Sequence, residues 1–169
     1  MKARRATPLA RIELLLLDVD GVLTDGRLYF SGSGEELKTF HVRDGHGIKL
    51  LMQSGVAVAA VSGRRSSAVT ARMRELKVRN VVQGCADKVA ALMDLARRLD
   101  IDPLACACLV DDTPDLPLMA AVGFAAAVAD AHPLVLSAAH WISRTPGGRG
   151  AVRELCDALL RARGAGRKK

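Results

Sequence analysis

The run of four leucines at Leu14–Leu17 constrains the fold more than any other feature of the sequence. Four apolar residues without alternation predict a short strand that is buried on both faces, as in a parallel sheet covered by helices. Asp18 and Asp20 follow the run, and because side chains alternate along a strand, both point to one side, about 6.6 Å apart. Open α/β sheets bind ligands at this end of their strands, and paired carboxylates there favour a hard divalent cation. An acid-rich turn is the alternative interpretation.

Strand and helix patterns alternate along most of the remaining chain. Two short strands, 27–30 and 37–42, flank the turn-forming residues 31–34 and predict a β-hairpin inserted at about 25–43. Beyond the hairpin, the alternation predicts an α/β fold with a doubly wound, mostly parallel sheet of Rossmann type. The predicted strands are 56–61, 80–82, 106–110 and short ones near Phe124 and Trp141; the predicted helices are 44–54, 64–77, 87–99, one from Asp115, and 151–160.

Size and charge distribution limit the possible functions. The chain has 169 residues, enough for one full domain, which we place at 12–160. The net charge of +7 comes from the two ends: residues 1–11 and 161–169 hold nine of the 25 Lys and Arg and no acid, so we expect basic tails. With only 3% aromatic residues and no basic body, a nucleic-acid partner is not expected.

Cysteine usage and hydropathy indicate the cellular compartment in which the protein is expected to function. The four cysteines form no CxxC pair and are expected to be buried, reduced residues. No apolar run approaches the length that spans a bilayer. We therefore expect a cytoplasmic protein without a membrane partner.

Chemically useful residues follow several predicted strands. Ser62 follows the strand 56–61, Lys88 lies in the first turn of a helix, and Asp111 follows the strand 106–110. Because parallel strands deliver their carboxyl ends to one edge, these groups should meet Asp18 and Asp20. A carboxylate nucleophile, a second carboxylate for proton transfer, a hydroxyl, an ammonium and a divalent cation together suit phosphoryl transfer.

The four segments that carry these groups resemble the motifs of the haloacid dehalogenase superfamily of phosphatases. They are Asp18-Val19-Asp20-Gly21-Val22, Ser62-Gly63-Arg64, Lys88 and Asp111-Asp112-Thr113-Pro114-Asp115. The resemblance implies that Asp18 is the nucleophile, that Asp20 is the general acid and base, and that Ser62 and Lys88 hold the phosphoryl group. It also implies Mg²⁺ bound by Asp18, the main-chain carbonyl of Asp20 and Asp111, with Asp112 and Asp115 in support.

A narrower resemblance extends over residues 12 to about 160. The stretches DVDGVLTDG, GEELKTFHVRDGHGIKLL, DAHP and GGRGAVRELCD are similar to those of the 3-deoxy-D-manno-octulosonate 8-phosphate phosphatase family, which serves lipopolysaccharide synthesis. That family has a hairpin in place of a cap domain and forms homotetramers through its hairpins. The spacing agrees, because neither the 44 residues from Asp18 to Ser62 nor the 26 from Ser62 to Lys88 could hold a second domain.

The same resemblance implies contacts to a sugar acid phosphate. Cations would bind its carboxylate and phosphate, and polar groups its hydroxyls. Taken singly, each residue also has a purely structural explanation, such as a strand end or a solvated helix-end charge. The implied contacts are Asp20, His41, Val42, Arg43, Asp44, Gly45, Lys49, Arg64, Arg72 and Lys88.

Two details and three alternatives remain open at the level of sequence. The family usually has glycine where this chain has Val110, which would matter only if the loop needs a glycine conformation. Gly147-Gly148-Arg149-Gly150 precedes a helix and could cradle an anion or form a flexible connection.

The alternative functions differ in the residues that they require. A phosphatase of a related nonulosonate 9-phosphate would share every catalytic group. A response-regulator receiver domain lacks the Asp18-x-Asp20 spacing, and a non-catalytic scaffold would not need the reactive set.

Overall fold

A six-stranded sheet forms the centre of the molecule. The computed structural model describes residues 6–166, and every strand pairing within this sheet is parallel. The strand order is β5-β4-β1-β6-β7-β8, with β1 near the middle. The strands are β1 (Leu14–Leu17), β4 (Ala57–Ser62), β5 (Asn80–Gln83), β6 (Cys106–Val110), β7 (Phe124–Ala127) and β8 (Trp141–Ile142).

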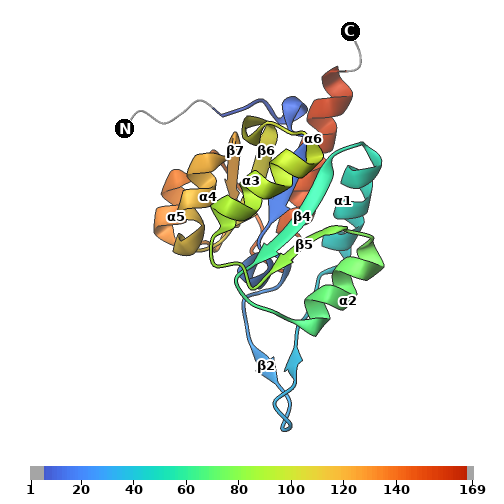
Figure 1. The fold of residues 1–169 in the computed structure, drawn as a ribbon, viewed down its shortest axis with the longest axis vertical. Helices are drawn as coiled ribbons and strands as arrows, with labels where there is room; N and C mark the ends of the chain where they lie inside the picture. Colours follow the sequence, from blue (N-terminus) through green and yellow to red (C-terminus); the bar gives the residue numbers. More distant parts are fainter. Residues whose placement is uncertain (1–5, 167–169) are drawn as a thin grey trace.

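Helices cover both faces of the sheet, as the alternation predicts (Figure 1). One face carries α1 (Val42–Gln53), α2 (Ser67–Leu76) and α6 (Ala151–Gly166), and the other carries α3 (Lys88–Leu99), α4 (Leu116–Ala121) and α5 (Pro133–Ala138). The doubly wound α/β prediction is therefore confirmed. No helix of the described residues is long and apolar enough to cross a membrane.

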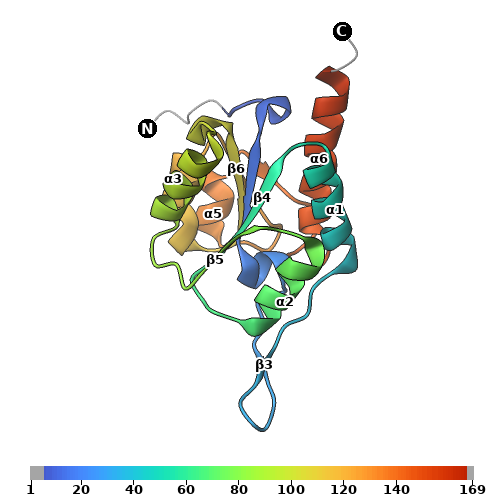
Figure 2. The ribbon, with the colours of Figure 1, turned by 45° about the vertical axis from the view of Figure 1, so that its right-hand side comes forward.

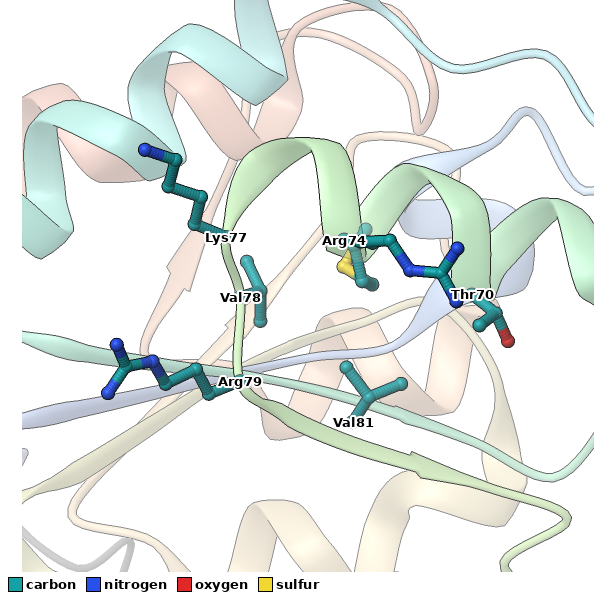
Figure 3. Close-up of a pocket in the computed structure, with 7 residues that line it drawn as sticks. Thr70, Arg74, Lys77, Val78, Arg79 and Val81 are labelled. Carbon is teal, nitrogen blue, oxygen red and sulfur yellow. The ribbon is translucent and has the colours of Figure 1, made fainter.

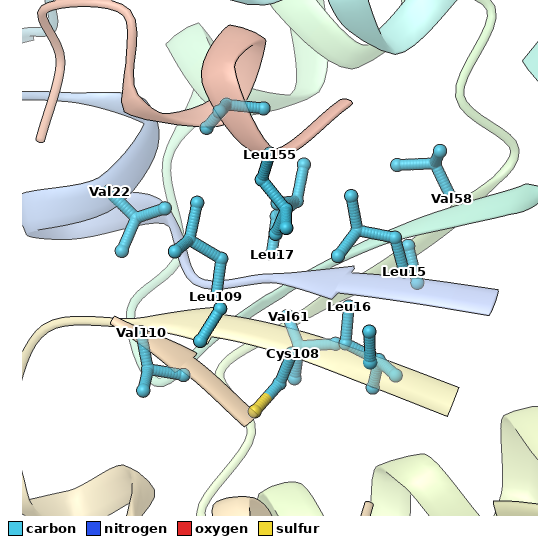
Figure 4. Packing of buried hydrophobic residues seen from close by; sticks show 14 of the residues in the cluster. Leu15, Leu16, Leu17, Val22, Val58, Val61, Cys108, Leu109, Val110 and Leu155 are labelled. Carbon is cyan, nitrogen blue, oxygen red and sulfur yellow. The ribbon is translucent and has the colours of Figure 1, made fainter. Parts of the chain in front are cut away.

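The leucine run lies in the core on both of its faces. Leu14–Leu17 are each no more than 1% exposed, and burying one such side chain contributes about 1.5–3 kcal/mol. In Figure 4, Leu15 and Leu17 lie on the side of Leu155 from α6, whereas Leu16 lies on the side of Cys108. The strand is thus anchored from both sides, and this fixes where Asp18 leaves the sheet.

An antiparallel hairpin projects beyond the carboxyl ends of the central strands. Its strands, β2 (Tyr29–Phe30) and β3 (Glu36–Leu37), are shorter than predicted, and Figure 2 shows the hairpin extending away from the body, on the side opposite the carboxyl end of α6. The segment predicted to be strand up to Val42 is irregular from Lys38 on. The reason is that α1 begins at Val42, where the His41 Nδ1 accepts a hydrogen bond from the Arg43 amide and caps the helix.

Three helices also differ from the sequence prediction. Helix α2 begins at Ser67 and not at residue 64, because the Arg64 amide bonds to the Ser62 hydroxyl in a loop. Helix α5 was not predicted, since six residues are too few to display a helical period. Helix α6 continues to Gly166, and its Arg163 guanidinium donates to the Ile12 carbonyl, so part of the basic segment 161–169 is helical.

Candidate active site

The loop after β1 presents Asp18 and depends on a glycine. Gly21 has a φ of +84°, and a Cβ at this position would lie 2.0 Å from the Asp111 Oδ2. Only glycine allows both the left-handed backbone and the close approach of Asp111. The buried Thr24 closes the loop, because its hydroxyl donates to the Val19 carbonyl. The loop therefore brings Asp18 and Asp111 together from two adjacent strands.

Lys88 joins two of the acidic residues. Its Nζ lies 2.8 Å from the Asp18 Oδ1 and 2.7 Å from the Asp115 Oδ1. Burial would lower the pKa of the Lys88 ammonium, but the charges of Asp18 and Asp115 outweigh it and raise that pKa. Ser62, the last residue of β4, is 3% exposed and its hydroxyl lies at the same edge. The predicted convergence of Asp18, Ser62 and Lys88 is observed.

A cluster of carboxylates at this edge fits a divalent cation. Asp18, Asp111 and Asp115 each offer one oxygen within 4.8 Å of the others. Burial, and then the charge of Asp18, raises the pKa of Asp111 to about 8 and that of Asp115 to about 6. The Asp111 Oδ1 is buried and has no hydrogen-bond partner among residues 6–166. An unpaired buried carboxylate oxygen beside two other acids is the arrangement that a hard cation stabilises.

The sequence prediction placed Asp115 only in support of the metal, whereas the structure makes its carboxylate a full member of the cluster. Asp20 contributes no carboxylate oxygen to this cluster, which is compatible with a ligand role for its main chain. Asp112 instead accepts a hydrogen bond from the Thr113 amide and stabilises the turn before α4. Val110 is the buried last residue of β6 and has no positive φ, so the missing glycine does not displace Asp111.

These residues line an open cavity of about 390 Å³. Arg64 and Cys85 also reach it, and Cys85 is therefore not the buried residue that the sequence predicted, unlike Cys106, Cys108 and Cys156. The complete lining is Asp18, Asp20, Gly26, Ser62, Gly63, Arg64, Cys85, Ala86, Lys88, Asp111, Asp112, Pro114 and Asp115.

Sequence reasoning missed two hairpin residues beside this cavity. The Lys38 ammonium pairs with the Asp20 carboxylate, and the Glu36 carboxylate pairs with the Arg64 guanidinium. Burial opposes ionisation of Glu36, but a hydrogen bond from Ser66 and the charges of Lys38 and Arg64 outweigh it and lower the pKa of Glu36. The available signal was their spacing of two residues, which places Glu36 and Lys38 on one side of an extended segment.

A second hollow, of about 420 Å³, lies between the end of α2 and the start of β5 (Figure 3). Arg74, Lys77 and Arg79 line it together with apolar side chains, and no acid or hydroxyl of the predicted reactive set reaches it. It lies at the amino end of β5, whereas Ser62 pairs with Gln83 at the carboxyl end. The residues predicted to be catalytic, Asp18, Asp20, Ser62 and Lys88, therefore all line the first cavity.

Comparisons with known proteins agree with this site. A family model described as haloacid dehalogenase-like hydrolase matches residues 80–155. A 3-deoxy-D-manno-octulosonate 8-phosphate phosphatase of Yersinia pestis is 48% identical over 153 residues, which cover 90% of this chain and 82% of the relative. The chain belongs to the 3-deoxy-D-manno-octulosonate 8-phosphate phosphatase family.

Solved structures of this phosphatase family share the whole fold. The enzyme of Moraxella catarrhalis, in complex with magnesium ion, phosphate ion and a KDO molecule, superposes with a TM-score of 0.91 at 38% identity, covering 93% of this chain and 90% of that one. The cobalt-bound enzyme of Haemophilus influenzae gives 0.90 at 42% identity, covering 94% and 92%. A divalent cation site thus fits both the family and the carboxylates of this chain.

The predicted substrate contacts of this phosphatase do not all meet in one cavity. Asp20, Arg64 and Lys88 line the catalytic cavity. His41 and Arg43 line a separate hollow, with Asp25, Thr39, Gly148 and Arg149. Lys49 lines a third hollow, beside the end of α2, and Val42 is 78% exposed.

The remaining predicted contacts are engaged in packing within the chain. Asp44 is 1% exposed, and its carboxylate accepts hydrogen bonds from the Gly150 and Arg153 amides at the start of α6. Arg72 pairs with Glu75 at 2.8 Å, and a Cβ on Gly45 would lie 2.3 Å from the Arg72 Nη2. The Asp44 side chain and Gly45 therefore hold α1 against its neighbours, and neither reaches the catalytic cavity.

The segment Gly147-Gly148-Arg149-Gly150 of this phosphatase uses the amides of its three glycines for hydrogen bonds within the chain, so these amides are not free to cradle an anion. The Gly148 amide donates to the Val22 carbonyl at 2.9 Å, and the Gly147 amide donates to the Asp130 carboxylate at 2.9 Å. A Cβ on Gly147 would lie 1.7 Å from the Gly21 carbonyl oxygen. The segment packs directly against the loop that follows Asp18 and supports its shape.

Proposed function

We propose that this chain hydrolyses 3-deoxy-D-manno-octulosonate 8-phosphate, with Mg²⁺, through an aspartyl-phosphate on Asp18. The observation that carries the proposal is the convergence of Asp18, Lys88, Asp111 and Asp115 at one sheet edge in a chain 48% identical to such a phosphatase. The reaction serves the synthesis of a lipopolysaccharide precursor, in the cytoplasm.

In the first step, a carboxylate oxygen of Asp18 attacks phosphorus while the bond from phosphorus to the sugar oxygen breaks. Lys88 and Ser62 hold the equatorial oxygens, whose negative charge must be neutralised in the transition state. The pairing of Lys88 with Asp18 at 2.8 Å keeps the ammonium charged and beside the reacting centre. These groups position the phosphoryl group and do not themselves exchange protons with it.

Asp20 performs both proton transfers. Its carboxylic acid gives a proton to the departing sugar oxygen, and the resulting carboxylate takes a proton from the water that attacks the aspartyl-phosphate. The bond from phosphorus to the Asp18 oxygen then breaks and phosphate leaves. Asp20 lines the cavity with a half-buried side chain, so it is accessible to both the sugar and water.

Asp18, Asp111 and the main-chain carbonyl of Asp20 would hold Mg²⁺, with Asp115 beside them. When bound, the ion neutralises the repulsion between the Asp18 carboxylate and the anionic substrate. Gly21 leaves the space that Asp111 needs to reach this position.

The exposed apolar hairpin supports a homotetramer assembled through the hairpins. Large apolar side chains gather there without cover from the chain itself, which marks an interaction surface. His41, Val42, Arg43, Lys49 and Arg72 would then contact a sugar acid in the cavity of a neighbouring subunit. The exposed side chains at or beside the hairpin are Leu28, Tyr29, Phe30, Leu37 and Val42.

The test is a phosphate-release panel with Mg²⁺ that contains the eight-carbon acid phosphate, a nonulosonate 9-phosphate and simple sugar phosphates. We expect the eight-carbon substrate to give the highest kcat/KM, and Asp18→Asn to abolish release while leaving the circular dichroism spectrum unchanged, because the amide keeps the shape and lacks the nucleophilic charge. Preference for the nine-carbon substrate would change the substrate assignment. Equal, weak rates on all compounds would overturn the assignment of a sugar acid phosphate as the substrate.

A further inference from the structure

The return segment of the hairpin inserts a lysine into the catalytic centre. The Lys38 side chain is only 1% exposed, although it belongs to a projecting hairpin. Its ammonium contacts the Asp20 carboxylate and lies 3.5 Å from the Glu36 Oε1. A buried ammonium is stable only when it is paired, so the fold holds Lys38 against these two carboxylates.

Asp20 depends on this lysine for its orientation. Within residues 6–166, Lys38 is the only hydrogen-bond donor to the Asp20 carboxylate, and it comes from a segment 18 residues away. The backbone at Asp20 is irregular and leads directly into Gly21, so the main chain alone does not restrain the side chain. A general acid must lie within hydrogen-bond reach of the atom it protonates.

Glu36 links Lys38 to Arg64, which lines the cavity. The same Oε1 that lies near Lys38 accepts from the Arg64 Nη2 at 2.5 Å. The Arg64 amide, in turn, donates to the Ser62 hydroxyl at 3.1 Å. A chain of charged side chains thus runs from Asp20 through Lys38 and Glu36 to Arg64, whose backbone amide contacts the Ser62 hydroxyl.

We propose that Lys38 is a positioning residue that aims the Asp20 carboxyl at the leaving oxygen, and that Glu36 and Arg64 hold Lys38 in place. The inference rests on the proposed phosphatase function and adds a role for the hairpin within the reaction of its own subunit. In the step concerned, the bond from phosphorus to the leaving oxygen breaks, and the Asp20 proton moves to that oxygen. Lys38 keeps its own proton throughout.

The variant Lys38→Met keeps an unbranched side chain, one atom shorter, and removes the charge. We expect kcat/KM for the sugar acid phosphate to fall about 10- to 100-fold, a part of the 10²–10⁴ that general acid catalysis supplies. For 4-nitrophenyl phosphate, whose leaving group departs without a proton, we expect kcat/KM to fall less than about 3-fold. Lys38→Arg, which keeps a cation, should restore most of the loss.

The controls separate positioning from folding and assembly. Arg97→Met likewise replaces a cation with methionine, at an exposed position on α3 outside the cavity, and should leave both substrates unaffected. Light scattering should give one assembly state for all variants. Where Lys38→Met does not fold, Lys38→Gln, which keeps a polar end, carries the same test.

The results distinguish this inference from the proposed function. Equal losses on both substrates, or no loss on either, would overturn the positioning role while the wild-type activity stands. A wild-type protein that is inert toward the sugar acid phosphate would instead overturn the proposed function, and with it the role of Lys38.

Discussion

Asp111 is the residue whose surroundings indicate a cation most directly. It lies among acids, one of its oxygens is buried without a partner in the described chain, and Gly21 leaves room for it. Its pKa is raised to about 8 because burial and the charge of Asp18 both disfavour its ionised form. On the proposed function, a metal ion that binds here would exchange with this proton.

This exchange predicts a pH dependence of stability. Asp111 in the folded protein holds a proton between its ordinary pKa of 3.8 and about 8, a range in which the unfolded chain has lost it. The folded state binds more protons, so the stability of the metal-free protein falls as the pH rises through this window. Asp115, with its pKa raised to about 6, acts in the same direction.

Thermal denaturation with and without Mg²⁺ checks the prediction. The increase in Tm on adding Mg²⁺ should be several-fold larger at about pH 9 than at about pH 6, because the ion no longer competes with a proton. Asp111→Asn should lose most of the increase at both values. A Mg²⁺ effect that is the same at both values would contradict the account.

The sequence identified the reactive residues that follow buried strands, and it missed those that the tertiary fold brings in. Asp18, Ser62 and Asp111 each follow an apolar strand, so their position at one edge follows from parallel pairing. Lys38 belongs to no regular element, and its contact with Asp20 depends on how the hairpin folds back. Asp44 matched a substrate segment, but its carboxylate is bound to α6.

At the scale of elements, the hairpin carries two sets of residues that the sequence could not separate. Its outer residues are apolar and exposed, whereas Glu36 and Lys38 turn inward to the cavity. The sequence predicted longer hairpin strands because it contains no signal for the cap that starts α1 at Val42. Short segments such as α5 likewise form because their neighbours pack on them, and not through a periodic pattern.

Assembly through the hairpin is tested by placing a charge at its most exposed aromatic position. Phe30 is 59% exposed, and Phe30→Glu should convert the proposed tetramer into monomers, because a carboxylate cannot be buried unpaired at an apolar interface. Size-exclusion chromatography with light scattering measures the mass, which should fall to a quarter.

Leu134→Glu is the matched control, since Leu134 is 57% exposed on α5, away from the hairpin. It should leave the mass unchanged. Wild-type mass for Phe30→Glu, or loss of assembly in both variants, would show that the hairpin is not the assembly surface.

For the whole molecule, the sequence predicted the fold class but not the order of the strands. The alternation of strands and helices indicates a doubly wound sheet, and the central position of β1 follows from its burial on both faces. The order of the outer strands depends on long-range pairing that no local pattern encodes. The basic end segments are partly helical, since Leu9–Arg11 forms a short helical turn and α6 extends to Gly166.

The central claim is that Asp18 takes phosphorus from the substrate and carries it briefly as an acyl phosphate. Mass spectrometry of the protein quenched in acid during turnover, after reduction of the acyl phosphate with borohydride and digestion, tests it most directly. The account predicts that the modified residue is Asp18 and that the signal is absent without substrate. Transient phosphate on any other residue would contradict it.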